Sequence, residues 1–176
     1  SGNPTPQNFY EIEDAIKELE SSSDKKPEPI VIEMKKEDGT VATVVPKDIL
    51  ETMKGKDVEV VLDMGDYSWT ISGESIKATN LEDINLEVEL NTNNIPSTTV
   101  EKIAGDNPTY QLSLTHEGPF GFKADLSINV GKDNAGKYGH LYYYRSDGTL
   151  VCESAGIIDE NGNVSLGFSH ASEYVV

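Results

Sequence analysis

The stretch VEVVLDMGDYSWTISG (residues 58–73) contains two runs of alternating apolar and polar residues on either side of a glycine. Such alternation places the two sets of side chains on opposite faces of a β-strand. Gly65 and the aspartate after it separate the runs and are typical of a tight turn, so the stretch predicts a β-hairpin. In its second run Tyr67, Trp69 and Ile71 share one face. Because such an apolar triplet usually belongs to a core, we expect Trp69 to be largely buried.

Similar short strand patterns continue on both sides of this hairpin. Residues 30–45, IVIEMKKEDGTVATVV, predict another hairpin with Asp38 and Gly39 in its turn. Further alternating stretches separated by Gly, Asn and Asp follow, namely INLEVEL, YQLSLTHEGPFGFKADLSINV, HLYYYRSDGTLVCES and NVSLGFSHASEYVV. Repeated short strands of this kind are typical of an antiparallel β-sandwich. We therefore expect a mainly β fold, with a β-sandwich domain over residues 30–176.

The N-terminal part of the chain, residues 1–29, has a different pattern. It begins and ends with polar, proline-containing stretches that predict linkers. Between them the apolar residues recur at spacings of three and four, the period of an amphipathic helix. These residues are Phe9, Ile12, Ile16 and Leu19. We expect a helix over residues 8–21.

Two further segments, VPKDILETMKG and IPSTTVEKIAG, align with each other at an offset of fifty residues. In each a proline stands where a first helical turn tolerates it and a glycine stands where the helix would end. They predict short helical turns at 46–54 and 96–104, with apolar residues such as Ile103 facing inward. Each is followed by two alternating runs around a glycine, Gly65 in one case and Gly118 in the other. The sequence thus indicates a pseudo-duplicated unit of helical turn plus hairpin.

The charge of the chain restricts its partners. Its 31 Asp and Glu against 14 Lys and Arg give a formal net charge of −17. A field of this sign repels nucleic-acid phosphates and anionic lipid head groups. We therefore expect no nucleic-acid partner and no direct membrane insertion.

Catalytic and metal-binding patterns are missing from the sequence. The single cysteine, Cys152, cannot form an internal disulfide, and it falls in a strand pattern where we expect it to be a small buried residue. His116, His140 and His170 are 24 and 30 residues apart, unlike the short spacings of metal ligands. Neither a nucleophile elbow nor a phosphate-binding glycine loop occurs. We expect no catalytic residue, no metal and no cofactor.

Three consecutive tyrosines are the most conspicuous candidate for a ligand site. In a strand, Tyr142 and Tyr144 point to one face and Tyr143 points to the other. Exposed tyrosines in sheets commonly serve as cross-strand packing partners, and this is the role that we expect. The alternative is that Tyr142 and Tyr144 form a platform on which a sugar stacks.

Residues 45–176 resemble the β-sandwich modules of large secreted or cell-wall-attached proteins of anaerobic Gram-positive bacteria. The shared features are YSWTISG, GFKADLSINVGKDNAGKYGHLYYY, DENGNVSLGF and SHASEYVV. The resemblance implies a non-catalytic extracellular module that acts as a spacer, scaffold or protein-interaction domain. Its partners would be neighbouring domains of the same polypeptide or another surface protein. The alternative function is a carbohydrate-binding module that holds a polysaccharide through Tyr142 and Tyr144.

Overall fold

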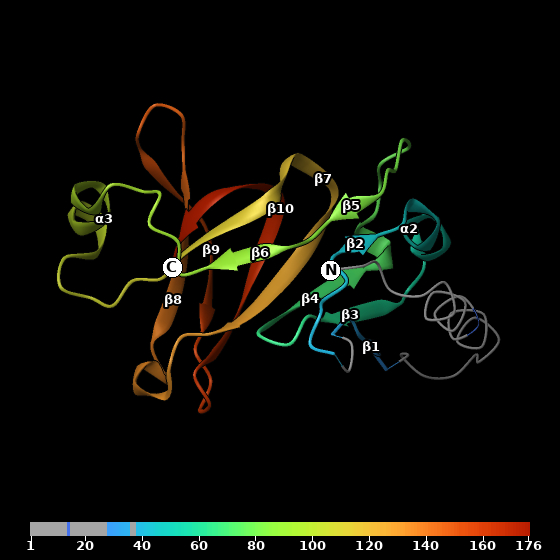
Figure 1. Ribbon diagram of the computed structural model, residues 1–176, viewed down its shortest axis with the longest axis horizontal. Coiled ribbons are helices and arrows are strands. Elements are labelled where there is room, and N and C mark those ends of the chain that lie inside the picture. The colour runs from blue at the N-terminus through green and yellow to red at the C-terminus, as the bar shows by residue number, and fades with distance from the viewer. Residues whose placement is uncertain (1–13, 15–27, 36–37) are drawn as a thin grey trace.

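The structure is a computed structural model that describes residue 14, residues 28–35 and residues 38–176 (Figure 1). The helix expected over residues 8–21 lies outside the described residues except for Asp14, and it stays a prediction. The described elements, in chain order, are β1 (Ile30–Glu33), β2 (Val44–Val45), α2 (Lys47–Met53), β3 (Glu59–Asp63), β4 (Tyr67–Ser72), the 3₁₀ turn η1 (Gly73–Ser75), β5 (Ile84–Asn85), β6 (Val88–Leu90), α3 (Ser97–Ala104), β7 (Gln111–Asn129), the 3₁₀ turn η2 (Lys132–Asn134), β8 (Tyr138–Tyr144), β9 (Leu150–Ile157) and β10 (Asn163–Val175).

Eight of these strands form one hydrogen-bonded sheet. Its order is β1-β3-β4-β7-β10-β8-β9, and β6 pairs with β7 beside this path. β2 and β5 form a separate two-stranded sheet. The fold is therefore mainly β, as expected. The sandwich itself is not confirmed, because the long strands belong to a single connected sheet.

The hairpin expected over residues 30–45 is wrong except at its tip. Among the described residues its two arms are joined at the bridge between Lys35 and Val41 and by the Ala42 amide, which donates to the Met34 carbonyl at 2.9 Å. β1 instead pairs with β3, and this pair is parallel, so the sheet is mixed rather than antiparallel. β2 pairs with β5. Asp38 and Gly39 specify only the local turn. The strand with which each arm pairs depends instead on contacts with apolar strands that are distant in sequence.

The hairpin at residues 58–73 forms as expected. β3 and β4 pair so that Leu62 lies opposite Trp69. Trp69 is fully buried, which confirms the prediction for its burial. Its indole Nε1 donates to the backbone oxygen of Leu86 at 2.8 Å, and the Phe168 ring lies edge-on to it at 5.4 Å. The centre of the core is therefore aromatic and contains a satisfied polar group.

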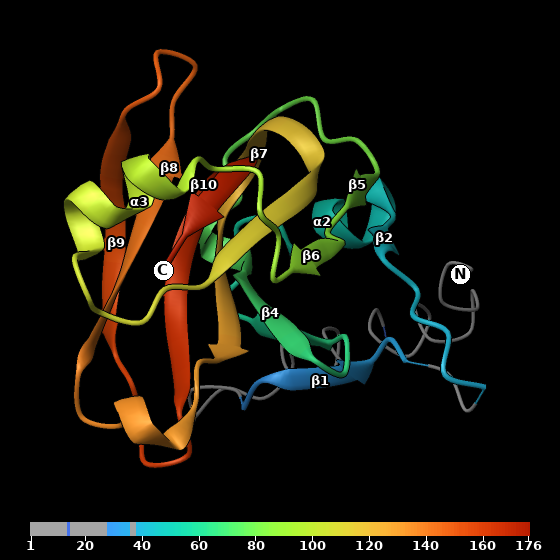
Figure 2. The ribbon, with the colours of Figure 1, turned by 60° about the vertical axis from the view of Figure 1, so that its left-hand side comes forward.

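The two long strands β7 and β10 connect the halves of the molecule. β4 pairs with the C-terminal part of β7 and β6 with its N-terminal part, while β10 pairs along both. Gly118 and Gly121 have positive φ angles of 84° and 82°, a backbone region that glycine reaches easily. Figure 2 shows β7 arching through this region. The second hairpin expected around Gly118 is wrong, because residues 111–129 form one strand. This strand pairs with β10 on both sides of the glycines and at Gly118 and Pro119, with a shift of register before and after that short paired stretch.

The two short helices lie within the ranges 46–54 and 96–104 given by the sequence, but they pack differently. In α2 the side chains of Ile49, Leu50 and Met53 are buried in the main core. In α3 only Val100 is buried, and Ile103, the counterpart of Met53, is 49% exposed. The inward orientation expected for Ile103 is therefore wrong. α3 lies beside the end of the sheet formed by β8, β9 and β10, and α2 lies near the opposite end (Figures 1 and 2).

Candidate functional site

The three tyrosines of β8 point to the faces that strand geometry predicts. Tyr143 faces the main core, where its ring lies 4.6 Å from the His170 ring and 5.8 Å from the Tyr174 ring. Tyr142 and Tyr144 point to the other face and pack, half-buried, against a second apolar cluster. Ile95, Val100 and Val175 form the buried part of this cluster, so it joins α3 to the sheet.

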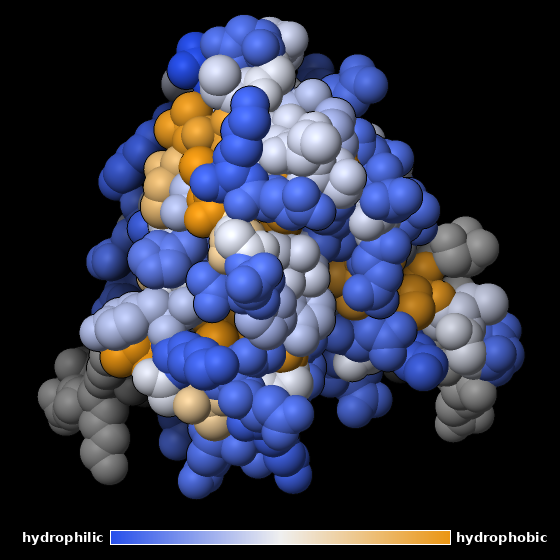
Figure 3. All heavy atoms as spheres, turned by 90° about the vertical axis from the view of Figure 1, so that its left-hand side faces the viewer, coloured by the Kyte–Doolittle hydropathy of each residue, from blue (hydrophilic) through white to orange (hydrophobic). Residues whose placement is uncertain are grey.

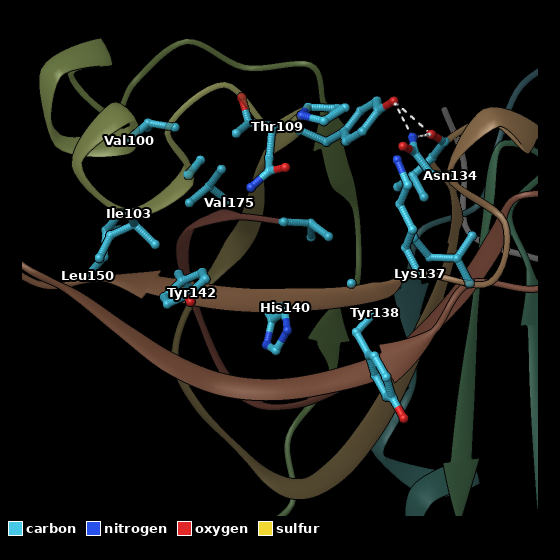
Figure 4. A pocket seen from close by; sticks show the side chains of 18 residues that line it. Val100, Ile103, Thr109, Asn134, Lys137, Tyr138, His140, Tyr142, Leu150 and Val175 are labelled. Atoms are coloured by element: carbon cyan, nitrogen blue, oxygen red, sulfur yellow. Dashed lines mark hydrogen bonds between the residues drawn. The ribbon is translucent and has the colours of Figure 1, made fainter.

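A groove of about 360 Å³ lies between α3, the loop that follows it, and β8. We call it the α3–β8 groove (Figure 4). Tyr138, His140 and Tyr142 lie along its β8 side, while Val100, Ile103 and Thr109 lie on the opposite side. The other lining residues are Ala104, Asn107, Pro108, Tyr110, Val130, Asn134, Lys137, Gly139, Leu150, Ile158, Val175 and Val176. The described structure thus brings α3, the 105–110 loop, β8 and the end of β10 together around one hollow.

A row of rings follows the β8 side of the groove. The ring centroids of Tyr138 and His140 are 6.5 Å apart, and those of His140 and Tyr142 are also 6.5 Å apart. Tyr138 is 65% exposed. Of the predicted pair, Tyr142 lines the groove, whereas Tyr144 packs beside α3 in the second cluster. Tyr142 is therefore the member of the pair that a groove ligand could reach.

Sequence reasoning missed Tyr138 and His140 as members of this row. The signal was present, because both lie at even spacings before Tyr142 and therefore share its strand face. The strand pattern taken from the sequence begins at His140, and only Tyr142 and Tyr144 are named on its exposed face. In the structure β8 already begins at Tyr138.

The lining of the groove differs in charge from the rest of the chain. Although the chain has 31 acidic residues, none of the described lining residues is Asp or Glu. Among the described lining residues, Lys137 is the only one whose side chain carries a permanent charge. Figure 3 shows the face that carries α3, where hydrophobic side chains lie between hydrophilic ones. A neutral ligand could therefore bind in the groove without desolvating an Asp or Glu side chain.

One end of the groove is fixed by a small polar network. The side-chain amide of Asn134 donates to the backbone oxygen of Val130 at 2.7 Å, and the Tyr110 hydroxyl donates to the same oxygen at 2.7 Å. Asn134 Nδ2 also lies 3.4 Å from the Tyr110 hydroxyl oxygen. Figure 4 draws this network beside Lys137. Because these groups bond one another, they hold the η2 turn and the 105–110 loop in place.

The other candidate residues lie apart from one another. His116 contacts the backbone oxygen of Pro119 at 3.2 Å, and His170 Nδ1 lies 3.2 Å from the Tyr174 hydroxyl. Cys152 is exposed on β9, so its expected burial is wrong. The reason is that β9 is an edge strand, most of whose residues are exposed. Within the described ranges no three His, Cys, Asp or Glu side chains converge as metal ligands would.

The hydroxyl of Tyr174 is the most strongly perturbed acid near the sheet. Burial raises its pKa well above the usual value, and the nearby charge of Glu153 raises it further. The hydroxyl donates to the backbone oxygen of His170 at 2.7 Å. Tyr174 therefore stays neutral and serves as a packed hydrogen-bond donor.

None of the helices in the described part of the chain has the length and apolar composition needed to cross a bilayer. Comparison with known proteins found no match to a family model, to a curated protein or to a solved structure.

Proposed function

We propose that the chain is a non-catalytic interaction module of a bacterial cell-surface protein, and that it contacts its partner through the α3–β8 groove. The observation that carries this proposal is that no described lining residue of the groove is Asp or Glu, in a chain of net charge −17. Charged residues are typically depleted from the centres of protein interfaces. The groove lining is depleted of charged residues in the same way, whereas the acidic chain as a whole repels other acidic proteins.

Exposed apolar side chains also favour the α3–β8 groove as the contact surface. Among the described residues five large hydrophobic side chains are exposed, and three of them border this part of the molecule. Ile103 lies in the groove wall and Tyr138 in the ring row, while Ile157 pairs with Tyr138 across β8 and β9 and is 61% exposed. Clustered exposed apolar groups are typical of interaction sites.

The extracellular or cell-wall location is part of the proposal and is supported by the sequence motifs given above. Partners of this kind are neighbouring domains of the same polypeptide or a second surface protein. Labelling intact cells of the source bacterium with an antibody against the module tests the location. Labelling that appears only after lysis would contradict it.

Site-specific photo-crosslinking tests the proposed surface. A photoreactive amino acid is placed at Ile103 or at Tyr138, and as a matched control at Glu51, an exposed residue of α2. We expect a discrete crosslinked product on intact cells from the two groove positions and none from Glu51. The same product from all three positions, or from Glu51 alone, would contradict the assignment of the surface.

Carbohydrate binding is the second candidate, and the row of rings at 6.5 Å spacing favours it. Aromatic faces provide an apolar surface against which a sugar ring can pack. A glycan screen with the parent protein and with the double variant Tyr142→Ala and Tyr144→Ala tests it. Binding of one polysaccharide that disappears in the folded double variant would make this the first function.

A further inference from the structure

The backbone edge of β8 is open along the groove. β8 pairs with β9 along its whole length, but with β10 only at Tyr142 and Tyr143. Among the described strands, the first four residues of β8, Tyr138–Leu141, therefore have a partner on one side only. In the described structure the groove occupies the other side.

The direction of these backbone groups follows from the observed hydrogen bonds and from strand alternation. The Lys137 carbonyl accepts from the Ile158 amide at 2.9 Å, so the backbone of residue 137 faces β9. Because backbone groups of successive residues point to opposite sides, Gly139 and Leu141 face β9 as well. The N–H and C=O of Tyr138 and His140 then face the groove.

The strand order leaves one strand position open between the opposite wall and the first residues of β8. Val176 exchanges both backbone hydrogen bonds with Tyr110, at 2.8 and 3.0 Å, so β10 separates the 105–110 loop from β8 at this point. Farther along, where β8 reaches His140 and Tyr138, no described strand lies between them. Two neighbouring interstrand spacings amount to about 9–10 Å, the width that one inserted strand requires.

The side walls match the alternating side chains of such a strand. At the end of β10, Val176 packs against the main core and Val175 packs against the second cluster. The side chains of a strand that continues the direction of β10 would therefore alternate between these two clusters. Val130 and Ile158 extend the main-core side of the groove, and Ala104 extends the second-cluster side. Strand addition uses main-chain hydrogen bonds for affinity and alternate pockets for side-chain selection.

We propose that the groove is a strand-acceptor site, which binds a short extended segment of a partner protein antiparallel to β8 through the backbone groups of His140 and Tyr138. This inference rests on the proposed interaction function and names the form of the partner. The segment carries uncharged side chains, because the described lining is mostly apolar and contains no Asp or Glu. We expect these side chains to be β-branched, because such residues favour the extended strand conformation. The groove is bounded on both sides, so a free extended segment fits and the edge of a folded second copy does not.

Amide hydrogen exchange during a peptide titration tests the site. The probe is the peptide acetyl-Thr-Val-Thr-Val-Thr-amide, and its control is the same peptide with every backbone amide N-methylated. We expect the probe to slow exchange at the amides of Tyr138 and His140 and to leave Gly139 and Leu141 unchanged. The methylated control should have no effect, since it cannot donate to the edge.

Two variants at one position separate backbone recognition from side-chain recognition. His140→Pro removes the amide that faces the groove and leaves the pairing with β9 intact, as proline is tolerated at strand edges. His140→Ala removes the side chain and keeps the amide. We expect His140→Pro to weaken peptide binding by about tenfold or more and His140→Ala to change it by less than about threefold. If His140→Pro does not fold, the amide exchange of the parent protein during the peptide titration tests the strand site on its own.

Several outcomes would overturn the inference. Equal loss of binding in both His140 variants would assign recognition to the imidazole. A neutral oligosaccharide that binds in the groove, survives His140→Pro and is lost in Tyr138→Ala would replace the strand by a sugar. Crosslinking from Ile103 without protection of Tyr138 and His140 would refute the strand site and leave the proposed function standing. If neither groove position gives a crosslinked product and the peptide protects neither Tyr138 nor His140, both the proposed function and the strand site are refuted.

Discussion

Val175 and Tyr142 form the outermost residue pair that joins β10 to β8. On one side of this pair the sheet is continuous, and on the other side β8 borders the α3–β8 groove. Both residues also belong to the apolar cluster beneath α3. The same contacts that attach α3 to the sheet therefore fix the position at which the groove begins.

The different burial of Val100 and Ile103 makes the attachment of α3 measurable. Val100→Ala removes buried apolar atoms and should lower the free energy of unfolding by about 1–2 kcal/mol. Ile103→Ala lies on the exposed groove wall and should change it by about 0.5 kcal/mol or less. Urea denaturation of the two variants gives the comparison. An equal or larger loss for Ile103→Ala would mean that α3 packs through its other face.

Trp69 should contribute more to stability than any other single side chain of the core. Trp69→Ala removes the largest fully buried side chain and should cost about 3–5 kcal/mol. Trp69→Phe keeps an aromatic ring but leaves the Leu86 carbonyl without its donor, which should cost about 1–3 kcal/mol. Chemical denaturation followed by circular dichroism measures both. A Trp69→Ala protein as stable as its parent would contradict the structural role.

Local patterns in the sequence predicted local structure well. The hairpin around Gly65 and the opposite faces of Tyr142 and Tyr143 follow from period-two alternation alone, which needs no knowledge of distant partners. The burial of Trp69 follows from the apolar triplet to which it belongs. These features depend on neighbours in the chain.

Features that depend on distant partners could not be predicted in the same way. The parallel pairing of β1 with β3 and the continuity of β7 through Gly118 are decided by which strands compete for each edge. The α3–β8 groove is formed by segments far apart in sequence, so only Tyr142 and Tyr144 could be named beforehand. Tyr138 could also have been predicted from the sequence, because it lies at an even spacing from Tyr142 and therefore shares its strand face.

The pair Tyr142 and Tyr144 should contribute to stability through packing under α3. The double change to Ala should lower the free energy of unfolding by about 1–2 kcal/mol, as expected for half-buried cross-strand aromatic residues. Thermal and urea unfolding measure the loss. An unchanged stability would show that the rings are free, which is the property of a ligand platform.

Tyr174 should make stability fall at alkaline pH. Its pKa is raised in the folded protein, first by burial and then by the charge of Glu153, so the neutral hydroxyl stabilises the fold fully below the unfolded pKa of about 10. Above that pH the unfolded chain loses the proton first, and stability should fall by up to about 1.4 kcal/mol per pH unit for this group.

The matched variant for this pH dependence is Tyr174→Phe. It loses the hydrogen bond to the His170 carbonyl and should be less stable at neutral pH. Its stability should nevertheless decline less steeply than that of the parent between pH 9 and pH 11. Parallel curves for the two proteins would assign the alkaline loss to other groups.

The openness of the groove is tested most directly by amide hydrogen exchange along β8 in the free protein, read residue by residue. The structure predicts alternation: Tyr138 and His140 should exchange fast because their amides face the groove, while Gly139 and Leu141 should exchange slowly because theirs face β9. Equal, strong protection of all four amides would show that the edge is already covered, and would contradict the groove as the contact surface.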